Sequence, residues 1–429
     1  MKALVSIATE KSTERAFLIG AELRACADGV HVDESLAELA ELARTAGAVV
    51  VGEASQRLEK PHAATFIGAG KAAEIAGHCQ ADGVDTVIFD EELSSAQARN
   101  LEELFGCKIL DRTNLILDIF AGRARTREGK LQVELAQLRY LLPRLTRYWT
   151  HLSRQKGGIG MRGGEGESQL EVDRRKIGER IDKLERELNS VRRQRDTQRK
   201  GRLRNQWPLA SMVGYTNAGK STLFNAVTGA AVLQEDKLFA TLDPTTRRLR
   251  LPTNQNVLLS DTVGFIRKLP HRLVEAFKAT LEEVVEADLL LHVVDVTHPH
   301  AEHHIESVNE VLKEIGAGEK PALLLFNKID AFDGGEHARR WLARFPGALA
   351  LSAKTGEGFE ALFDELGTAL RPVRSLMELS VPFEESGVLA RLHEVGQVLE
   401  RDYEGPRARL KVQVPPHCVN EFERFELKR

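Results

Sequence analysis

The feature that most constrains the fold is a phosphate-binding loop near the middle of the chain. The stretch "LASMVGYTNAGKST" is an apolar run that leads into GxxxxGKS, and the helical pattern "STLFNAVTG" follows. In such a loop, backbone N–H groups surround phosphates, the lysine reaches the β- and γ-phosphates, and the serine ligates magnesium at the helix start. This order of strand, loop and helix predicts a P-loop nucleotide-binding domain. The residues expected at the phosphates are Gly214, Tyr215, Thr216, Asn217, Ala218, Gly219, Lys220 and Ser221.

Motifs further along the chain select the nucleotide. "DTVG" at 261–264 follows the apolar run "NVLLS", which places Asp261 at a strand end near magnesium and lets the Gly264 N–H meet a γ-phosphate. "NKID" at 327–330 and "SAK" at 352–354 follow two further apolar runs. Asp330 can accept the N1 and N2 protons of guanine, which adenine does not supply, while Lys328 covers the ring. The motifs in this order predict a Ras-type GTPase domain over residues 205–372, with further nucleotide contacts from Thr262, Val263, Asn327, Ile329, Ser352, Ala353 and Lys354.

Switch I must supply a threonine to magnesium and to the γ-phosphate. The segment "DKLFATLDPTTRR" contains Thr241, Thr245 and Thr246. The phrase "FATLDPTTR" resembles switch I of the translation-factor-related GTPases that include the Obg and HflX families, in which the threonine of TLDP is the ligand. This resemblance favours Thr241, flanked by the expected contacts Phe239, Ala240, Leu242 and Asp243. The expected catalytic groups are thus Lys220, Thr241 and Gly264, and the expected Mg²⁺ ligands are Ser221 and Thr241.

The residue that follows DTVG bears on the rate of hydrolysis. Ras-like enzymes have a glutamine here that orients the attacking water, whereas this chain has Phe265, which has no hydrogen-bonding group. We therefore expect slow intrinsic turnover and an external element that completes the site. Asn217 occupies the loop position at which some related GTPases bind a monovalent cation, so a potassium requirement stays open.

The segment 123–204, called the basic arm below, carries 23 Lys and Arg residues against 11 Asp and Glu, although the whole chain has a net charge of only −3. One interpretation is a solvated helix pair with salt bridges to acidic residues such as Asp182, Glu185 and Glu187. The other is a surface that binds a polyanion, and RNA is the abundant polyanion of the cytosol. The size of the excess favours RNA.

The helical hairpin expected over 112–204 carries two apolar stripes at three- and four-residue steps. Between its helices, residues 157–166 contain six glycines, so the segment 157–168 is expected to be a loop at the hairpin tip. Helices of roughly 25 to 40 residues would carry this loop away from the base, and the tip would need no contact with the rest of the protein. The stripes consist of Leu131, Leu135, Leu138, Leu142 and Leu145, and of Leu170, Ile177, Ile181, Leu184, Leu188 and Val191.

Residues 1–111 alternate β-rich runs with helical patterns, which predicts a small α/β subdomain. The expected strands are "KALVSIAT", "AVVVGE", "ATFIG", "DTVIFD" and "CKILD", and one helix lies in "DESLAELAELARTAG", with Asp33 as its cap and Gly47 as its stop. The string "GAGK" at 68–71 lacks the first glycine and the hydroxyl residue of a phosphate loop, so we interpret it as a strand-to-helix turn. Residues 373–429 predict a small α+β domain to which no chemistry is assigned.

Composition points to an intracellular protein. No apolar run approaches the roughly 18 residues of a membrane span, and the amino terminus lacks a signal-peptide pattern. The four cysteines lack the spacing of a zinc site or a disulfide framework. We expect a cytoplasmic monomer with no membrane segment, while peripheral membrane association stays open. The cysteines are Cys26, Cys79, Cys107 and Cys418.

Over essentially its whole length, the chain resembles the HflX family of ribosome-associated GTPases. The motifs that carry the resemblance are "FIGAGK", "GGIGMRG" followed by "QLEVDRR", "VGYTNAGKSTLFN", "FATLDPTTR", "DTVGFI" and "NKID". The family loop usually reads GGIGxRGPGExQLExDRR, whereas "RGGEGESQ" has no proline and is one residue longer.

The resemblance implies a partner and an activity. The hairpin and its loop would reach the RNA of the large ribosomal subunit near the peptidyl-transferase region, and the GTP-bound protein would split stalled or idle ribosomes. Arg154, Lys156 and Arg162 would pair with phosphates in the loop, and Arg174 and Arg175 at the helix base.

Two other classes of function share part of these sequence features. A GTP- or ATP-dependent RNA-remodelling factor in ribosome assembly would use the same basic arm, but a single guanine-selective domain with no second motor domain argues against a processive helicase. A signalling GTPase switch that acts on a protein partner would not need a basic hairpin with a glycine loop.

Overall fold

The computed structural model describes residues 13–23, 32–148, 169–204, 207–229, 238–239, 241–268, 281–332, 335–370, 375–414 and 418–427. The chain divides into two units, Met1–Leu188 with Pro270–Ala276, and Asn189–Leu269 with Phe277–Arg429. The multidomain α/β class expected from the sequence is confirmed. Outside the described residues lie the glycine loop with Arg154, Lys156 and Arg162, the expected strand "KALVSIAT", Cys26 and Ala240.

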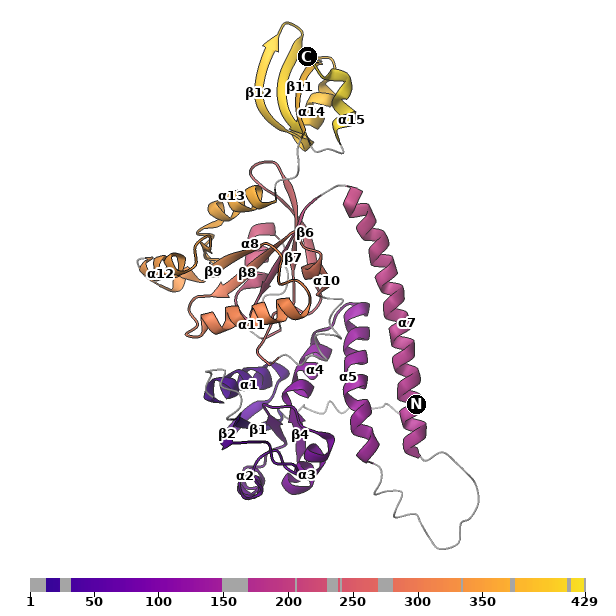
Figure 1. Ribbon diagram of the computed structural model, residues 1–429, viewed down its shortest axis with the longest axis vertical. Helices are drawn as coiled ribbons and strands as arrows, with labels where there is room; N and C mark the ends of the chain where they lie inside the picture. Colours follow the sequence, from indigo (N-terminus) through magenta and orange to yellow (C-terminus); the bar gives the residue numbers. More distant parts are fainter. Residues whose placement is uncertain are drawn as a thin grey trace, which may run out of the picture. The chain divides into compact units, whose positions relative to one another are not determined.

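The first unit contains a parallel four-stranded sheet in the order β2-β1-β3-β4, with helices around it (Figure 1). The central strand β1 was not expected from the sequence. Residues 16–21 of β1 are buried throughout, so the strand reads as a continuous apolar run without the alternation that marks a half-buried strand. The elements are β1 (Arg15–Leu23), α1 (Val32–Ala46), β2 (Val49–Leu58), α2 (Ala69–Ala81), β3 (Thr86–Phe89), α3 (Ser95–Phe105) and β4 (Lys108–Asp111).

Two local expectations in this unit need correction. Asp33 lies inside the first turn of α1 and does not cap it, although Gly47 follows the helix at φ +96° as expected of a helix stop. No strand forms at "ATFIG", because this segment turns back on itself through an isolated bridge between His62 and Phe66. "GAGK" therefore leads from a turn into α2, and Lys71 pairs with Glu74 on the surface.

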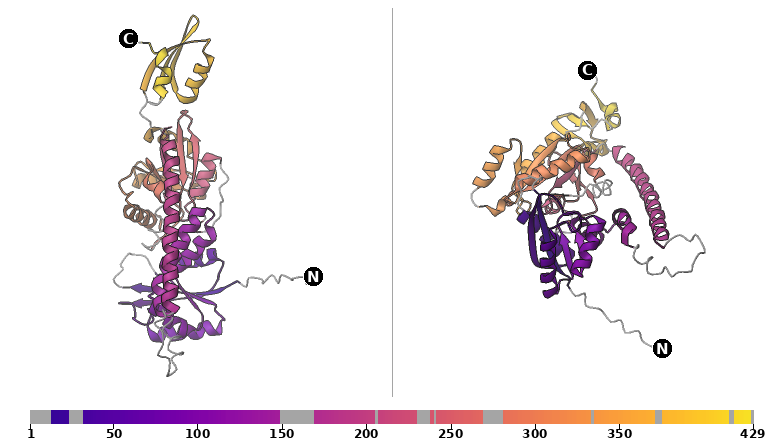
Figure 2. Two further views of the ribbon diagram at one scale, coloured as in Figure 1. Left: turned by 90° about the vertical axis from the view of Figure 1, so that its right-hand side faces the viewer. Right: turned by 60° about the horizontal axis from the view of Figure 1, so that its bottom comes forward.

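The helical region consists of α4 (Arg112–Arg123), α5 (Arg127–Tyr148) and α7 (Gln169–Arg204). The described part of α5 has 22 residues, and a break after Arg123 separates it from α4. In the first unit, α5 and the beginning of α7 lie side by side (Figures 1 and 2). The expected apolar seam between them is confirmed for Leu131, Leu135, Leu138, Leu142, Ile177, Ile181, Leu184 and Leu188.

Ion pairs run along the same seam. The Arg180 guanidinium donates two hydrogen bonds to the Glu134 carboxylate, at 2.7 and 2.8 Å. Arg139 pairs with Glu185 at 2.5 Å. The interpretation of the arm as a helix pair with salt bridges is thus confirmed in part, and it leaves the excess of positive charge to be explained.

The last described turns of α5 are anchored to the α/β subdomain, whereas the hairpin tip lies outside the described residues. Tyr140 Oη and Arg144 Nη2 donate to the two carboxylate oxygens of Asp111, each at 2.7 Å. Arg144 also donates to the Leu93 carbonyl and lies over the Tyr140 ring at 3.5 Å. Asp111 is buried, and its carboxylate also accepts from the backbone N–H of Asn114. Asp111 thereby caps α4.

We expect Asp111→Asn to destabilise the first unit by about 3 kcal/mol, because an amide cannot balance the largely buried Arg144 guanidinium. Hydrogen exchange measured across the full chain in denaturant should show faster exchange in α4 and α5. The control is Glu179→Gln, which removes an exposed partner 3.9 Å from Arg175 and should cost less than about 0.5 kcal/mol. Equal protection in the two variants would show that Asp111 does not anchor α5.

The second unit contains a six-stranded sheet in the order β10-β9-β8-β5-β7-β6, parallel except for the pairing of β6 with β7. One core cluster packs α8 and α13 on one face, and another packs α11 and α12 on the other. The elements are β5 (Leu209–Gly214), α8 (Lys220–Thr228), β6 (Thr245–Arg250), β7 (Asn256–Asp261), α10 (Glu282–Val285), β8 (Leu289–Asp295), α11 (Ala301–Glu314), β9 (Ala322–Asn327), η1 (Ile329–Ala331), α12 (Glu336–Arg344), β10 (Leu349–Ala350) and α13 (Phe359–Ala369).

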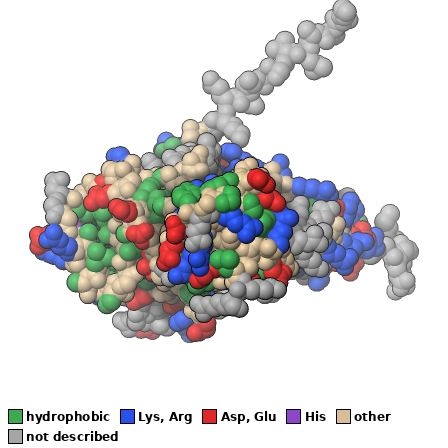
Figure 3. Space-filling model, turned by 90° about the horizontal axis from the view of Figure 1, so that it is seen from above, with side chains coloured by type: hydrophobic (Ala, Val, Ile, Leu, Met, Phe, Trp, Pro, Cys, Tyr) green, Lys and Arg blue, Asp and Glu red, His purple; other side chains and the backbone are tan. Residues whose placement is uncertain are grey.

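The carboxyl-terminal part of the chain forms a three-stranded antiparallel sheet in the order β11-β13-β12, as the expected α+β class requires. α14 and α15 contribute to the core on one face of it (Figure 2). Seen from above, hydrophobic, basic and acidic side chains are intermixed, so no single charge dominates (Figure 3). The elements are β11 (Ser375–Pro382), α14 (Ser386–Val395), β12 (Gln397–Glu404), β13 (Arg407–Val414), α15 (Val419–Phe422) and η3 (Glu423–Phe425).

Among the described helices, none combines the length and apolar character of a membrane span.

Candidate nucleotide site

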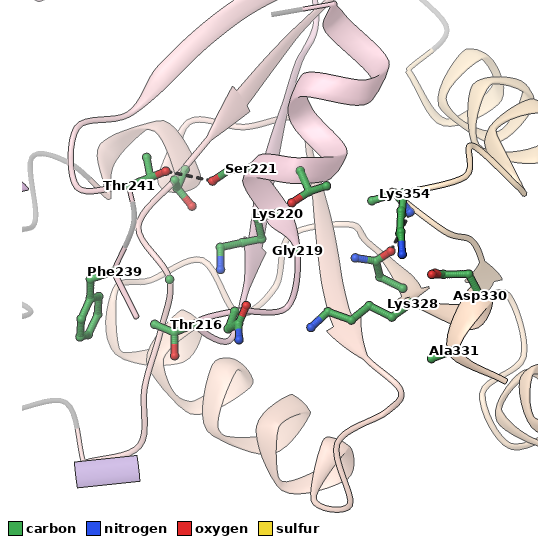
Figure 4. Close-up of a pocket in the computed structure, with 16 residues that line it drawn as sticks. Thr216, Gly219, Lys220, Ser221, Phe239, Thr241, Lys328, Asp330, Ala331 and Lys354 are labelled. Atoms are coloured by element: carbon green, nitrogen blue, oxygen red, sulfur yellow. Dashed lines mark hydrogen bonds between the residues drawn. The ribbon is translucent and has the colours of Figure 1, made fainter. Parts of the chain in front are cut away.

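A cavity of about 440 Å³ lies at the carboxyl edge of the six-stranded sheet (Figure 4). The parallel strands β5, β8 and β9 end at this edge, and the P-loop and the NKID motif follow two of them directly. The described residues that line the cavity are Thr216, Asn217, Gly219, Lys220, Ser221, Thr222, Phe239, Thr241, Thr262, Gly264, Asn327, Lys328, Asp330, Ala331, Ala353 and Lys354.

The P-loop requires glycine where it approaches other motifs. Gly219 has φ +91°, and a Cβ built there would lie 2.2 Å from Asn327 Nδ2. A Cβ at Gly264 would lie 2.8 Å from Thr216 Cγ2 and 3.0 Å from Lys220 Nζ. Any larger residue would push these motifs apart, so the two glycines bring backbone N–H groups close to the cavity.

Lys220 brings a buried positive charge to the cavity. Its ammonium donates to the carbonyls of Gly214, at 3.1 Å, and Tyr215, at 2.7 Å. Burial lowers the pKa of Lys220 to about 8, and the neighbouring Asp261 opposes this shift. A buried ammonium without a matching anion is costly, so the site favours a negatively charged ligand such as a phosphate.

Three oxygen-bearing side chains meet beside Lys220. Ser221 Oγ lies 2.9 Å from Thr241 Oγ1 and donates to Asp261 Oδ2 at 2.7 Å, and Thr241 also donates to this oxygen at 3.2 Å. Burial raises the pKa of Asp261. Its second oxygen, Oδ1, is buried without a hydrogen-bond partner among the described residues. Two hydroxyls and a carboxylate oxygen that lacks a donor fit Mg²⁺ and its bound water.

The alternative switch I residues lie elsewhere. Thr245 and Thr246 belong to β6 and pair in register with Asp261 and Ser260 of β7. Of the three threonines considered, the structure thus brings Thr241 to Ser221.

The opposite side of the cavity is built by the NKID and SAK motifs. Asn327 is buried, donates to the Ala218 carbonyl at 2.8 Å and accepts from the Ala353 N–H at 2.9 Å, so it connects three motifs. Ser352 Oγ donates to Asp330 Oδ1 at 2.6 Å, which orients the carboxylate and leaves Oδ2 for a ligand. This arrangement offers an acceptor to a base that carries N–H donors.

Lys328 is held by a residue that sequence reasoning missed. Its backbone has φ +69°, and its ammonium donates to Asp295 Oδ2 at 2.6 Å. Asp295 ends β8 and also accepts from the N–H and hydroxyl of Thr297. The signal in the sequence was the acidic residue at the end of the apolar run "LLLHVVD".

Not every expected residue lines the cavity. Asp261 and Ser352 act through the hydrogen bonds described above, and Gly214 and Tyr215 through their carbonyls, which accept from Lys220. Two lining residues, Thr222 and Ala331, were not expected, although each directly follows an expected contact. The expected residues outside the lining are Gly214, Tyr215, Ala218, Leu242, Asp243, Asp261, Val263, Ile329 and Ser352.

Phe265 points away from the reacting region. Its side chain is 1% exposed, and it is absent from the cavity lining. Its backbone N–H donates to the Gly214 carbonyl at 3.1 Å, and its carbonyl accepts from Thr216 N–H at 2.8 Å. The residue that replaces the usual glutamine is thus part of the hydrophobic interior.

Protein-family models match most of the chain. Residues 33–121 match a GTP-binding GTPase N-terminal domain, residues 123–202 a GTP-binding GTPase middle region, and residues 210–328 a 50S ribosome-binding GTPase domain.

Curated relatives extend the similarity over nearly the full length. A protein named GTPase HflX from Magnetococcus marinus is 48% identical over 393 residues, covering 91% of this chain and 90% of the relative. GTPase HflX from Lacrimispora saccharolytica is 49% identical, covering 89% of each chain. GTPase HflX from Escherichia coli is 48% identical, covering 89% of this chain and 90% of the relative. Together with the cavity lined by the P-loop and the NKID motif, these similarities show that the chain belongs to the HflX family of GTPases and is a GTP-hydrolysing enzyme.

Proposed function

We propose that the cavity binds GTP with its phosphates at the P-loop and its base at the NKID motif. The observation that carries this proposal is the convergence of Lys220, the Ser221–Thr241–Asp261 group and Asp330 around one cavity. Lys220 would meet the β- and γ-phosphates, and Asp330 Oδ2 would accept from the guanine edge. The remaining lining residues would shape the site around the nucleotide.

Mg²⁺ fits the oxygen atoms beside Lys220. Ser221 and Thr241 would ligate it, and Asp261 would hold a bound water through its second carboxylate oxygen. The ion supplies positive charge to the phosphates when it is bound. Among the described residues, no group of three or more His, Cys, Asp or Glu side chains forms a protein-only metal cage.

Hydrolysis in this site is expected to depend on a partner. Lys220, Thr241 and the Gly264 N–H would stabilise charge at the γ-phosphate, but the buried Phe265 cannot orient a water molecule. We infer that an element from outside the chain completes the site. Without it, the enzyme should turn over slowly.

The partner we propose is the RNA of the large ribosomal subunit. The basic arm has a local charge excess, with 23 Lys and Arg residues against 11 Asp and Glu. The ion pairs along the α5–α7 seam leave this excess unchanged, because each joins one basic and one acidic residue of the arm. The match to a 50S ribosome-binding GTPase model agrees with this partner. We further propose a cytoplasmic, monomeric protein that splits stalled or idle ribosomes in its GTP-bound state.

The test replaces residues 157–168 by a short neutral linker. GTP binding and basal hydrolysis should stay near wild type, because the described residues that line the cavity all lie between Thr216 and Lys354. Splitting of intact ribosomes, followed by light scattering with excess GTP, should slow by at least about tenfold, while residual ribosome binding should weaken steeply with salt. Unchanged splitting would show that the loop only connects the two helices of the hairpin.

The same assay separates the alternatives. An RNA-remodelling factor would unwind or rearrange isolated ribosomal RNA without splitting intact particles. A signalling switch would not sediment with ribosomes in either nucleotide state. Stimulation of single-turnover hydrolysis by large subunits would support the expected role of the partner.

A further inference from the structure

The Tyr215 side chain lies outside the nucleotide cavity although Tyr215 belongs to the P-loop. It is 7% exposed, and its ring stacks on that of His304 with the centroids 3.7 Å apart and the planes at 4°. His304 is on α11, which packs against β5 and β8. The stack therefore joins the P-loop to a helix from which no described residue lines the cavity.

Tyr215 also holds the segment that begins with the DTVG motif, called switch II here and defined as residues 261–268. Its hydroxyl oxygen accepts a hydrogen bond from the Arg267 N–H at 2.9 Å. The backbone of Phe265 itself donates to the Gly214 carbonyl and accepts from the Thr216 N–H. Switch II is thus attached to the P-loop both at Phe265 and at Arg267.

The surroundings of His304 make it a neutral stacking partner. Burial, together with the nearby His298, His300 and Arg267, lowers its pKa to about 3, and Asp295 opposes this shift. His298 packs against His304 at 4.3 Å between ring centroids. A neutral, half-buried ring gains from flat stacking without the cost of burying a charge.

The attachment bears on Gly264, which directly precedes Phe265. A Cβ at Gly264 would lie 3.0 Å from Lys220 Nζ, so this backbone passes very close to the lysine that would meet the γ-phosphate. A small displacement of switch II would move the Gly264 N–H away from that phosphate. A hydrogen bond to the γ-phosphate assists hydrolysis most when its donor is already in place before the reaction.

We propose that Tyr215 and His304 are positioning residues that hold switch II in the register at which the Gly264 N–H meets the γ-phosphate of GTP. This inference rests on the proposed role of Gly264. GDP has no γ-phosphate, so its binding does not need this register. Loss of the stack should therefore weaken GTP binding and hydrolysis but leave GDP binding unchanged, which distinguishes positioning from a general effect on folding.

The test measures dissociation constants for GDP and for a non-hydrolysable GTP analogue, together with single-turnover GTP hydrolysis, in the full chain. For His304→Ala we expect about a tenfold loss in analogue affinity and in hydrolysis, with GDP affinity within about twofold of wild type. His304→Phe keeps a flat ring and should restore both. Tyr215→Phe keeps the ring and removes the acceptor for Arg267 N–H, so hydrolysis should fall by several fold.

Two further variants make the outcome decisive. Val308→Ala removes a buried side chain from the same helix, and it controls for a general destabilisation of α11. Equal losses of GDP and analogue affinity in His304→Ala, or no loss of either, would overturn the positioning role.

Gly264→Ala tests the premise, since an unchanged ratio of analogue to GDP affinity in this variant would refute the proposed role of Gly264 and the inference with it. A changed ratio in Gly264→Ala with an unchanged ratio in His304→Ala would refute the inference alone.

Discussion

Lys220→Ala should lower the affinity for GTP by roughly 10³-fold, which corresponds to about 4 kcal/mol. The Lys220 ammonium is buried at the cavity and donates to two P-loop carbonyls, so it is held beside the expected phosphates before the nucleotide binds. Alanine would leave the phosphate charge in a desolvated site without its cation. The measurement is equilibrium binding of a fluorescent GTP derivative.

The control for this change is Lys313→Ala on the exposed side of α11, which removes a lysine of the same unit outside the cavity. Its nucleotide affinity should equal that of wild type. Thermal unfolding of both nucleotide-free variants checks that each is folded. If GTP bound to Lys220→Ala with wild-type affinity, the phosphates would have to lie elsewhere, and the assignment of the cavity would be wrong.

Asp330→Asn should change the base that the enzyme prefers. Ser352 Oγ donates to Oδ1, so the amide oxygen should keep that position and the NH₂ group should replace Oδ2. Guanine would then face a donor where it needs an acceptor, and the loss of two hydrogen bonds to a charged group should cost about 3 kcal/mol or more. Xanthine has an oxygen in place of the 2-amino group of guanine, so this variant should bind xanthosine triphosphate in preference to GTP.

Competition between GTP and xanthosine triphosphate measures the change directly. Wild type should favour GTP strongly, and Asp330→Asn should reverse the order. Asp364→Asn, on the exposed surface of α13, makes the same chemical change away from the cavity and should leave the preference intact. A strongly GTP-selective Asp330→Asn variant would mean that Asp330 does not read the base.

The chemistry of the nucleotide site follows largely from the sequence, because its determinants are local. GxxxxGKS, DTVG, NKID and SAK each lie where an apolar strand ends, and parallel strands bring such ends to one edge of a sheet. The choice of Thr241 needed a resemblance to known switch I sequences, since three threonines of equal chemistry lie close together. The apolar seam between α5 and α7 was also predictable from its helical period.

Tertiary structure decided the contacts between segments distant in sequence. The central strand β1, the anchoring of Tyr140 and Arg144 to Asp111, and the pairing of Asp295 with Lys328 have no periodic signal. The Tyr215–His304 stack is of the same kind, since one ring comes from the P-loop and the other from α11. Periodicity and motif spacing report which face of an element is buried or which backbone a ligand approaches, whereas the partner of a buried polar or aromatic side chain is set by how distant elements pack.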